Sequence, residues 1–168
     1  MKHTISVVVE DKPGVLARVS AMFSNRGFNI HSLAVGPTHI EGRSRITLVC
    51  DAPELEQLQK QLHKLVNVIK VHEFDSSTAV VSEVMLARVA CDPGSRGAAN
   101  DTGALFGARV VDLSEDSITF EVAGDPDLLQ AFIDHMTPFG IVDLVKSGRI
   151  AMKKQSNMRP AAVSGMSR

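Results

Sequence analysis

Apolar residues along the first part of the chain switch between two spacings. From Thr4 to Glu10 they fall mostly on alternate positions, a pattern typical of a strand with one buried face. From Pro13 to Asn25 they recur every three or four residues, as on the inner face of a helix. Repeated switches predict the order β-α-β-β-α-β. The other predicted elements are strands at 28–35, 44–50 and 66–74 and a helix that opens at Asp51.

This order is the split βαβ, or ferredoxin-like, pattern. It predicts a four-stranded antiparallel sheet with both helices on one face, and therefore an α+β fold. The opposite face would leave Val8 and its neighbours open to solvent. We expect a second copy of the sheet to cover it.

The second half repeats the pattern less clearly. Its first helix is the weakest element, because Gly97 and Gly103 lower the helix propensity. We predict two tandem ferredoxin-like βαββαβ domains, each with two helices on one face of a four-stranded antiparallel sheet. The predicted divisions are a domain at 1–75, a linker at 76–79, a domain at 80–152 and a flexible tail at 153–168. The elements of the second domain are predicted at 80–90, 95–106, 108–113, 117–122, 126–136 and 141–146.

The corner between the first strand and the first helix reads Asp-Lys-Pro-Gly-Val-Leu, from Asp11 to Leu16. Asp and Pro there are typical of an ordinary helix start, with Pro13 in the first turn. The same residues also suit a small zwitterion. A helix N-terminus offers unpaired N–H groups to a carboxylate, Gly14 allows close approach, and Asp11 could hold an ammonium group. Spacing alone leaves both interpretations open.

Composition narrows the function classes. The chain has 168 residues, a net charge of −1 and no Trp or Tyr. These values give no reason to expect a nucleic-acid-binding surface. No apolar run reaches membrane-spanning length and no signal peptide is recognisable, so we expect a cytoplasmic protein without membrane contact. Cys50 and Cys91 are expected to be buried, reduced thiols.

Catalytic and metal-binding motifs are missing from the sequence. It has no nucleophile elbow, P-loop, C-x-x-C or H-E-x-x-H motif. The histidines are scattered, and we expect His31, His63 and His135 to be surface or edge residues. We therefore expect no catalytic residue, metal site or cofactor in this chain. If it supports a reaction, it acts from outside the active site.

Several longer motifs together resemble a known family. The run from Asp11 to Leu16 resembles the ACT domain, a small-molecule-binding module. With the further motifs, nearly the whole chain is similar to the regulatory, or small, subunits of acetolactate synthase (acetohydroxyacid synthase). The further motifs are F-S-N-R-G-F-N-I from Phe23, H-S-L-A-V-G-P-T from His31, S-R-I-T-L-V from Ser44, K-Q-L-H-K-L-V-N-V from Lys60, V-V-D-L-S from Val110, A-F-I-D-H-M-T-P-F-G-I from Ala131 and S-G-R-I-A-M from Ser147.

The resemblance implies a regulatory subunit without an active site of its own. Such a subunit binds and activates the catalytic, or large, subunit, which is a transferase of branched-chain amino acid biosynthesis. Thiamine diphosphate, Mg²⁺ and FAD are expected in that large subunit. The regulatory subunit confers feedback inhibition by valine, and in some members by leucine or isoleucine. Two ACT domains pair in a homodimer, with the effector at their interface.

The resemblance also implies which residues bind the effector. Asp11 would receive the ammonium group, although many members have Asn at this position. The carboxylate would bind the N–H groups around Gly14, Val15 and Leu16. Asn29 and Ile30 of the neighbouring chain would complete the pocket, by a hydrogen bond and an apolar contact.

Two other functions remain open from the sequence. One is a free-standing ACT-type amino-acid sensor that regulates transcription or another enzyme. The other is a self-contained enzyme on a ferredoxin-like fold, for which the sequence offers no nucleophile or acid–base pair.

Overall fold

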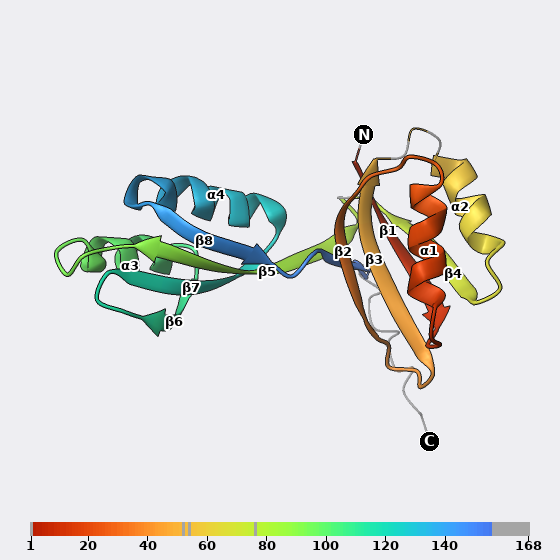
Figure 1. The fold of residues 1–168 in the computed structure, drawn as a ribbon, viewed down its shortest axis with the longest axis horizontal. Coiled ribbons are helices and arrows are strands. Elements are labelled where there is room, and N and C mark those ends of the chain that lie inside the picture. The colour runs from red at the N-terminus through yellow and green to blue at the C-terminus, as the bar shows by residue number, and fades with distance from the viewer. Residues whose placement is uncertain (1, 52, 54, 76, 156–168) are drawn as a thin grey trace, which may run out of the picture.

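The computed structural model describes residues 2–51, 53, 55–75 and 77–155. They form two antiparallel sheets, each with two helices on one face, joined by the long strand β5 (Figure 1). The mixed α+β fold predicted from the sequence is confirmed. The elements of the first sheet are β1 (Lys2–Glu10), α1 (Val15–Ser24), β2 (Ile30–Pro37), β3 (Arg43–Asp51), α2 (Leu55–His63) and β4 (Val68–Phe74). Those of the second are β5 (Ala79–Ala90), α3 (Arg96–Ala104), β6 (Arg109–Leu113), β7 (Ser117–Gly124), α4 (Pro126–Met136), a 3₁₀ turn (Thr137–Phe139), β8 (Ile141–Lys146) and β9 (Ile150–Lys153).

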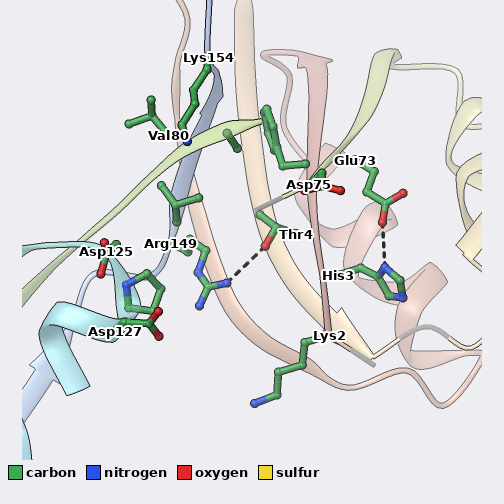
Figure 2. Close-up of a pocket in the computed structure, with 14 residues that line it drawn as sticks. Lys2, His3, Thr4, Glu73, Asp75, Val80, Asp125, Asp127, Arg149 and Lys154 are labelled. Atoms are coloured by element: carbon green, nitrogen blue, oxygen red, sulfur yellow. Dashed lines mark hydrogen bonds and ion pairs between the residues drawn. The ribbon is translucent and has the colours of Figure 1, made fainter. Parts of the chain in front are cut away.

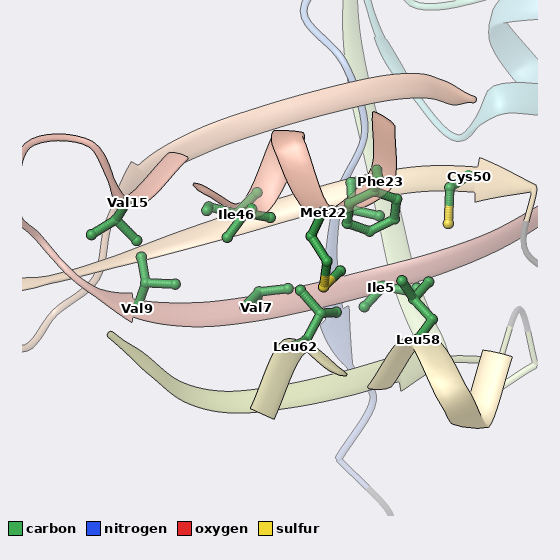
Figure 3. Close-up of a cluster of buried hydrophobic side chains, with 12 residues drawn as sticks. Ile5, Val7, Val9, Val15, Met22, Phe23, Ile46, Cys50, Leu58 and Leu62 are labelled. Atoms are coloured by element: carbon green, nitrogen blue, oxygen red, sulfur yellow. The ribbon is translucent and has the colours of Figure 1, made fainter. Parts of the chain in front are cut away.

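The first sheet has the strand order β2-β3-β1-β4, so β2 and β4 are its edges. Alternate side chains of β1 and β3 point toward the helices and form one core with α1 and α2 (Figure 3). Phe23 and Leu62 are fully buried in this core. The sheet therefore follows the predicted period of two, and the helices follow the period of 3.6.

Some element ends differ from the prediction. The first helix begins at Val15 instead of Pro13, because Gly14 has a left-handed backbone conformation that cannot continue a helix. The strand β3 continues to Asp51, where a helix was predicted to open. The strand β4 begins at Val68, and Val66 is 93% exposed in the preceding turn. Residues 52 and 54 lie outside the described residues.

The second sheet has the order β6-β7-β5-β8, with β9 paired to the first residues of β5. Its core lies between the sheet and helices α3 and α4. Three aromatic rings meet there edge to face: Phe132 lies 5.7 Å from Phe106 and 5.8 Å from Phe120 between ring centroids. This geometry is favourable for aromatic pairs.

The strand β9 was not predicted from the sequence. It is only four residues long, and it pairs with Ala79–Ser82 at the start of β5 to form a two-stranded ribbon. The predicted start of the flexible tail at residue 153 is wrong, because Lys153 is the last residue of β9. Residues 156–168 lie outside the described residues.

The ribbon covers part of the face of the first sheet that carries no helices. Residues of β1 and β3 on that face, Ser6, Thr47 and Val49, are buried. In the ribbon, Ala79 and Ala151 are also buried, and β9 contacts β3 and β4. We expected a second copy of the sheet to provide this cover. A ribbon of the same chain covers part of this face, since β5 extends beyond its own sheet and pairs there with β9, which contacts the first sheet (Figure 1). Cover of the remainder by a second copy stays a prediction.

The two glycines that weaken α3 differ in their surroundings. A Cβ on Gly103 would lie 2.8 Å from the Phe120 ring, which is fully buried, whereas a Cβ on Gly97 would meet nothing within 4 Å. Gly103 therefore lets α3 pack closely on the sheet, and Gly97 contributes no such contact.

We expect opposite effects of alanine at these two positions on the free energy of unfolding. Gly97→Ala should raise it by about 0.5–1 kcal/mol through helix propensity. Gly103→Ala should lower it by about 1–2 kcal/mol, because overpacking against Phe120 outweighs the same gain. Urea unfolding of the two variants beside the wild type measures both. Equal effects would contradict the close packing of α3.

Both cysteines are free and buried, as predicted. Burial raises the pKa of the Cys50 thiol to about 11, with smaller contributions from Asp51 and Glu73. This thiol is therefore protonated at neutral pH, and its role is packing in the first core. Among the described residues, no helix has the length and apolar character needed to cross a membrane.

Candidate effector site

The corner between β1 and α1 leaves several backbone donors free. Gly14 has φ +82°, in the left-handed region, and the helix begins directly after it. The N–H groups of Gly14, Leu16 and Ala17 make no hydrogen bond within the described chain, and that of Val15 makes a long one of 3.4 Å to the Lys12 carbonyl oxygen. A Cβ on Gly14 would meet nothing within 4 Å, so the approach to these donors is open.

Helices α4 and α1 both follow an aspartate, but they differ in how that aspartate is used. At α4, the Asp125 carboxylate accepts a hydrogen bond of 2.8 Å from the Leu128 N–H, with Pro126 as the first helical residue. At α1, the N-cap is Gly14 and no side chain caps the helix. The exposed Asp11 carboxylate makes no hydrogen bond or ion pair within the described chain. Of the two interpretations of the corner, the ordinary aspartate cap is therefore wrong.

Three charged side chains around the corner, Glu10, Lys12 and Arg18, have hydrogen-bond or ion-pair partners. Lys12 forms an ion pair of 2.9 Å with Glu10, and Glu10 also accepts a hydrogen bond from the Asn67 amide. These two bonds, the Lys12 bond first, hold the pKa of the Glu10 carboxyl below its usual value. Arg18 on α1 donates to the Asn67 side-chain oxygen at 2.8 Å. Asp11 has no such partner within the described chain, and it lies close to the free N–H donors.

The two parts of the predicted site lie at opposite ends of the first sheet. The corner follows Glu10, whereas Ile30 is in register with Cys50 and, through it, with His3. Seven residues of β1 separate those two levels, which is about 24 Å of strand. Within one chain, Asn29 and Ile30 therefore cannot contact a ligand held by Asp11 and Gly14.

The hydrogen bonds that link Asn29, His31 and Asp51 were not predicted from the sequence. The Nε2 of His31 lies 2.5 Å from an Asp51 carboxylate oxygen, and its Nδ1 lies 3.4 Å from the Asn29 amide nitrogen. The bond to His31 is also the main cause that lowers the pKa of Asp51. When the Nε2–H of His31 donates to Asp51, its Nδ1 can accept a hydrogen bond from the Asn29 amide nitrogen. The Asn29 amide oxygen then points away from His31. His31 was predicted to be a surface or edge residue, because the sequence shows no partner for it at ligand or triad spacing. Asp51 is twenty positions away along the chain.

A cavity of about 710 Å³ lies between the first sheet and the start of α4. Its wall carries acidic and basic side chains in similar number, including Lys2, Asp127 and Arg149 (Figure 2). Arg149, directly before β9, reaches across it toward Thr4 on β1. No group of three or more His, Cys, Asp or Glu side chains in the described part of the chain could hold a metal ion.

The fold and the glycine corner define a regulatory module of the ACT type, followed by a second α+β unit. Comparison with known proteins agrees. Residues 5–70 match the model of the small-subunit-like ACT domain of acetohydroxyacid synthase, and residues 82–155 match that of the small subunit of acetolactate synthase. Together the two models cover most of the chain.

Individual relatives match over almost the full length. The acetolactate synthase small subunit of Mycobacterium bovis is 49% identical over 154 residues, which is 90% of this chain and 92% of that protein. A probable acetolactate synthase small subunit of Archaeoglobus fulgidus is also 49% identical, over 90% of this chain and 96% of its own. The crystal structure of the Thermotoga maritima small subunit aligns with a TM-score of 0.84 at 29% identity, over 94% of this chain and 99% of that one. This chain belongs to the family of acetolactate synthase small, or regulatory, subunits.

Proposed function

We propose that this protein binds and activates the thiamine-diphosphate-dependent large subunit of acetolactate synthase and makes it sensitive to feedback inhibition by valine. The observation that carries the proposal is the open corner at Gly14 in a chain of this family. The effector is an amino acid, with valine as the first candidate and leucine and isoleucine as the others. Thiamine diphosphate, Mg²⁺ and FAD belong to the large subunit in this proposal, and this chain supplies regulation.

The chemistry of the corner supports an amino-acid effector. A free amino acid carries a carboxylate and an ammonium group on adjacent atoms. The free N–H groups of Gly14 and Leu16 suit the carboxylate, since charge-assisted bonds to a helix N-terminus are favourable. The unpaired Asp11 carboxylate suits the ammonium group. Val15 would contribute through its N–H, because its side chain is buried in the core.

The register of the first sheet supports a site shared by two chains. The strand β2 is an edge, and its Leu33 and Val35 side chains are 37% and 49% exposed. If two copies pair β2 with β2 in antiparallel fashion, the Ile30 end of one strand lies beside the Pro37 end of the other. Pro37 is level with Val9, which is close to the corner. The dimer would therefore bring Asn29 and Ile30 of the partner chain to the corner that they cannot reach within one chain.

Regulation then requires two conformations of the dimer that engage the large subunit differently. An effector shifts such a balance only by binding one conformation more tightly. A ligand at a seam between two copies meets this condition, because any change in how the copies pair changes the pocket itself. In this proposal the residues of the corner do not take part in the chemistry of the large subunit.

Calorimetry of the isolated chain with valine, leucine and isoleucine tests the effector. We expect one of the three to bind with one site per chain, and sedimentation to show a dimer. Purification together with the thiamine-diphosphate-dependent large subunit, followed by activity measurements with and without effector, tests the partner. A chain that binds an amino acid but not the large subunit would instead be a free-standing sensor.

A further inference from the structure

The short connector between β8 and β9, residues 147–149, joins the two sheets by more than covalent continuity. At one end it is fixed to the second sheet. The Ser147 N–H donates to the Val84 carbonyl oxygen at 2.9 Å, and the Val84 N–H donates to the Ser147 hydroxyl oxygen at 3.0 Å. These reciprocal bonds hold the connector against β5.

The other end of the connector is fixed to the first sheet, at the strand β2. The Arg149 N–H donates to the Ser32 hydroxyl oxygen at 2.7 Å. Gly148 has φ +87°, and a Cβ there would lie 2.6 Å from the Leu33 carbonyl oxygen. Only glycine permits both this backbone conformation and this approach, because any side chain would collide with the backbone of β2.

The Arg149 side chain completes the junction. Its Nε lies 3.1 Å from a carboxylate oxygen of Glu83, which is a buried residue of β5. Its Nη1 lies 3.4 Å from the Thr4 hydroxyl oxygen on β1 (Figure 2). A single arginine therefore links the long strand of the second sheet with two strands of the first. A mostly buried ion pair of this kind holds a defined geometry, since separation would leave Glu83 without its partner.

This junction meets β2 next to the residues proposed to bind the effector. Ser32 is two positions from Ile30, and the pairing of β2 with β3 shifts register between these two residues. A register shift is a place where a strand is re-aimed. A displacement of Asn29 and Ile30 by an effector would thus move Ser32 and Leu33, which the connector holds.

We infer that the connector, with Arg149 as its main positioning residue, couples the effector site to the second sheet. The inference rests on the proposed function and adds to it the route between the two halves of the chain. In this arrangement β2, through Ser32 and Leu33, sets the orientation of the second sheet relative to the first. The effector acts on that orientation through Ser32, Leu33 and Arg149.

The test compares Arg149→Ala, Ser32→Ala and the control Arg109→Ala in complex with the large subunit. Arg109 also pairs with a glutamate, Glu121. Arg109 is exposed and Glu121 half-buried, and both lie on the second sheet away from the connector. Both connector variants, Arg149→Ala and Ser32→Ala, should bind valine with an affinity within about threefold of that of the wild type. The coupling factor between valine binding and inhibition should fall at least about fivefold. Coupling factors between two sites are commonly 5–150-fold. The control variant Arg109→Ala should keep both the valine affinity and the coupling to inhibition. Ser32→Ala keeps the ion pair with Glu83, so it tests the same route if Arg149→Ala fails to fold.

The possible outcomes separate the two proposals. Full inhibition in both connector variants would overturn the coupling and leave the proposed function intact. A weakened affinity with unchanged maximal inhibition would also overturn it, because the connector would then act only on the pocket. If the wild-type chain binds none of the three amino acids, the proposed function is wrong and the coupling with it.

Discussion

Replacement of Gly14 by aspartate is expected to abolish the response to valine. The new carboxylate would lie among the N–H groups that are free in the structure and would repel the carboxylate of the effector. The loss of charge-assisted hydrogen bonds worth about 1.5–3 kcal/mol corresponds to an affinity at least about tenfold lower. Calorimetry gives the affinity, and valine inhibition of the complex with the large subunit gives the functional effect.

Gly14→Ala is the matched control for this variant. Alanine suffers from the same positive φ, at about 1–2 kcal/mol of stability, but adds no charge. Its Cβ would meet nothing within 4 Å. We expect the alanine variant to bind valine within about threefold of the wild type. Equal binding by the aspartate and alanine variants would show that the corner does not hold the carboxylate.

A mixture of two inactive variants tests whether the site is shared between chains. Asn29→His should weaken binding on the other side of the proposed pocket. In a mixed dimer of Gly14→Asp and Asn29→His chains, one pocket carries both changes and the other carries neither. Each mixed dimer should therefore regain one of its two sites. No recovery in confirmed mixed dimers would show that Gly14 of one chain and Asn29 of the other do not form one pocket.

The second large effect concerns the two cores. Phe23 and Phe132 are both fully buried, the first on the inner face of α1 and the second on that of α4. Truncation of either to alanine should lower the stability of its own core by about 3–5 kcal/mol. Because the two clusters have no member in common, we expect Phe132→Ala to leave valine binding within about twofold and Phe23→Ala to abolish it.

Unfolding in urea, followed by hydrogen exchange in each sheet, measures the two effects. Exchange should rise in the second sheet with Phe132→Ala and in the first with Phe23→Ala. If each variant instead raises exchange equally in both sheets, the chain unfolds as one unit. The division at residues 76–79, which stays a prediction, would then have no energetic meaning.

The candidate site was only partly accessible from the sequence. The motif around Asp11 indicated the corner, but it fitted both an aspartate cap and a ligand site. The backbone conformation of Gly14 distinguishes the two interpretations. It moves the helix start to Val15, so the Asp11 side chain does not cap the helix. The roles of Asn29 and Ile30 stay a prediction, because only a second chain can bring them to the corner.

The sequence by itself determined the α+β class, the order of the helices and of every strand before β9, and the inward face of the elements with a clear apolar period. These features are local, because the spacing of apolar residues is set within one or two turns of helix or a few residues of strand. The tertiary structure alone decided the strand β9, the cover on the first sheet and the junction at Arg149. Each of these depends on residues that are far apart in the chain, as with Arg149 and Ser32, 117 positions apart. Their contacts arise only when the sheets are already formed and leave no periodic pattern in the sequence.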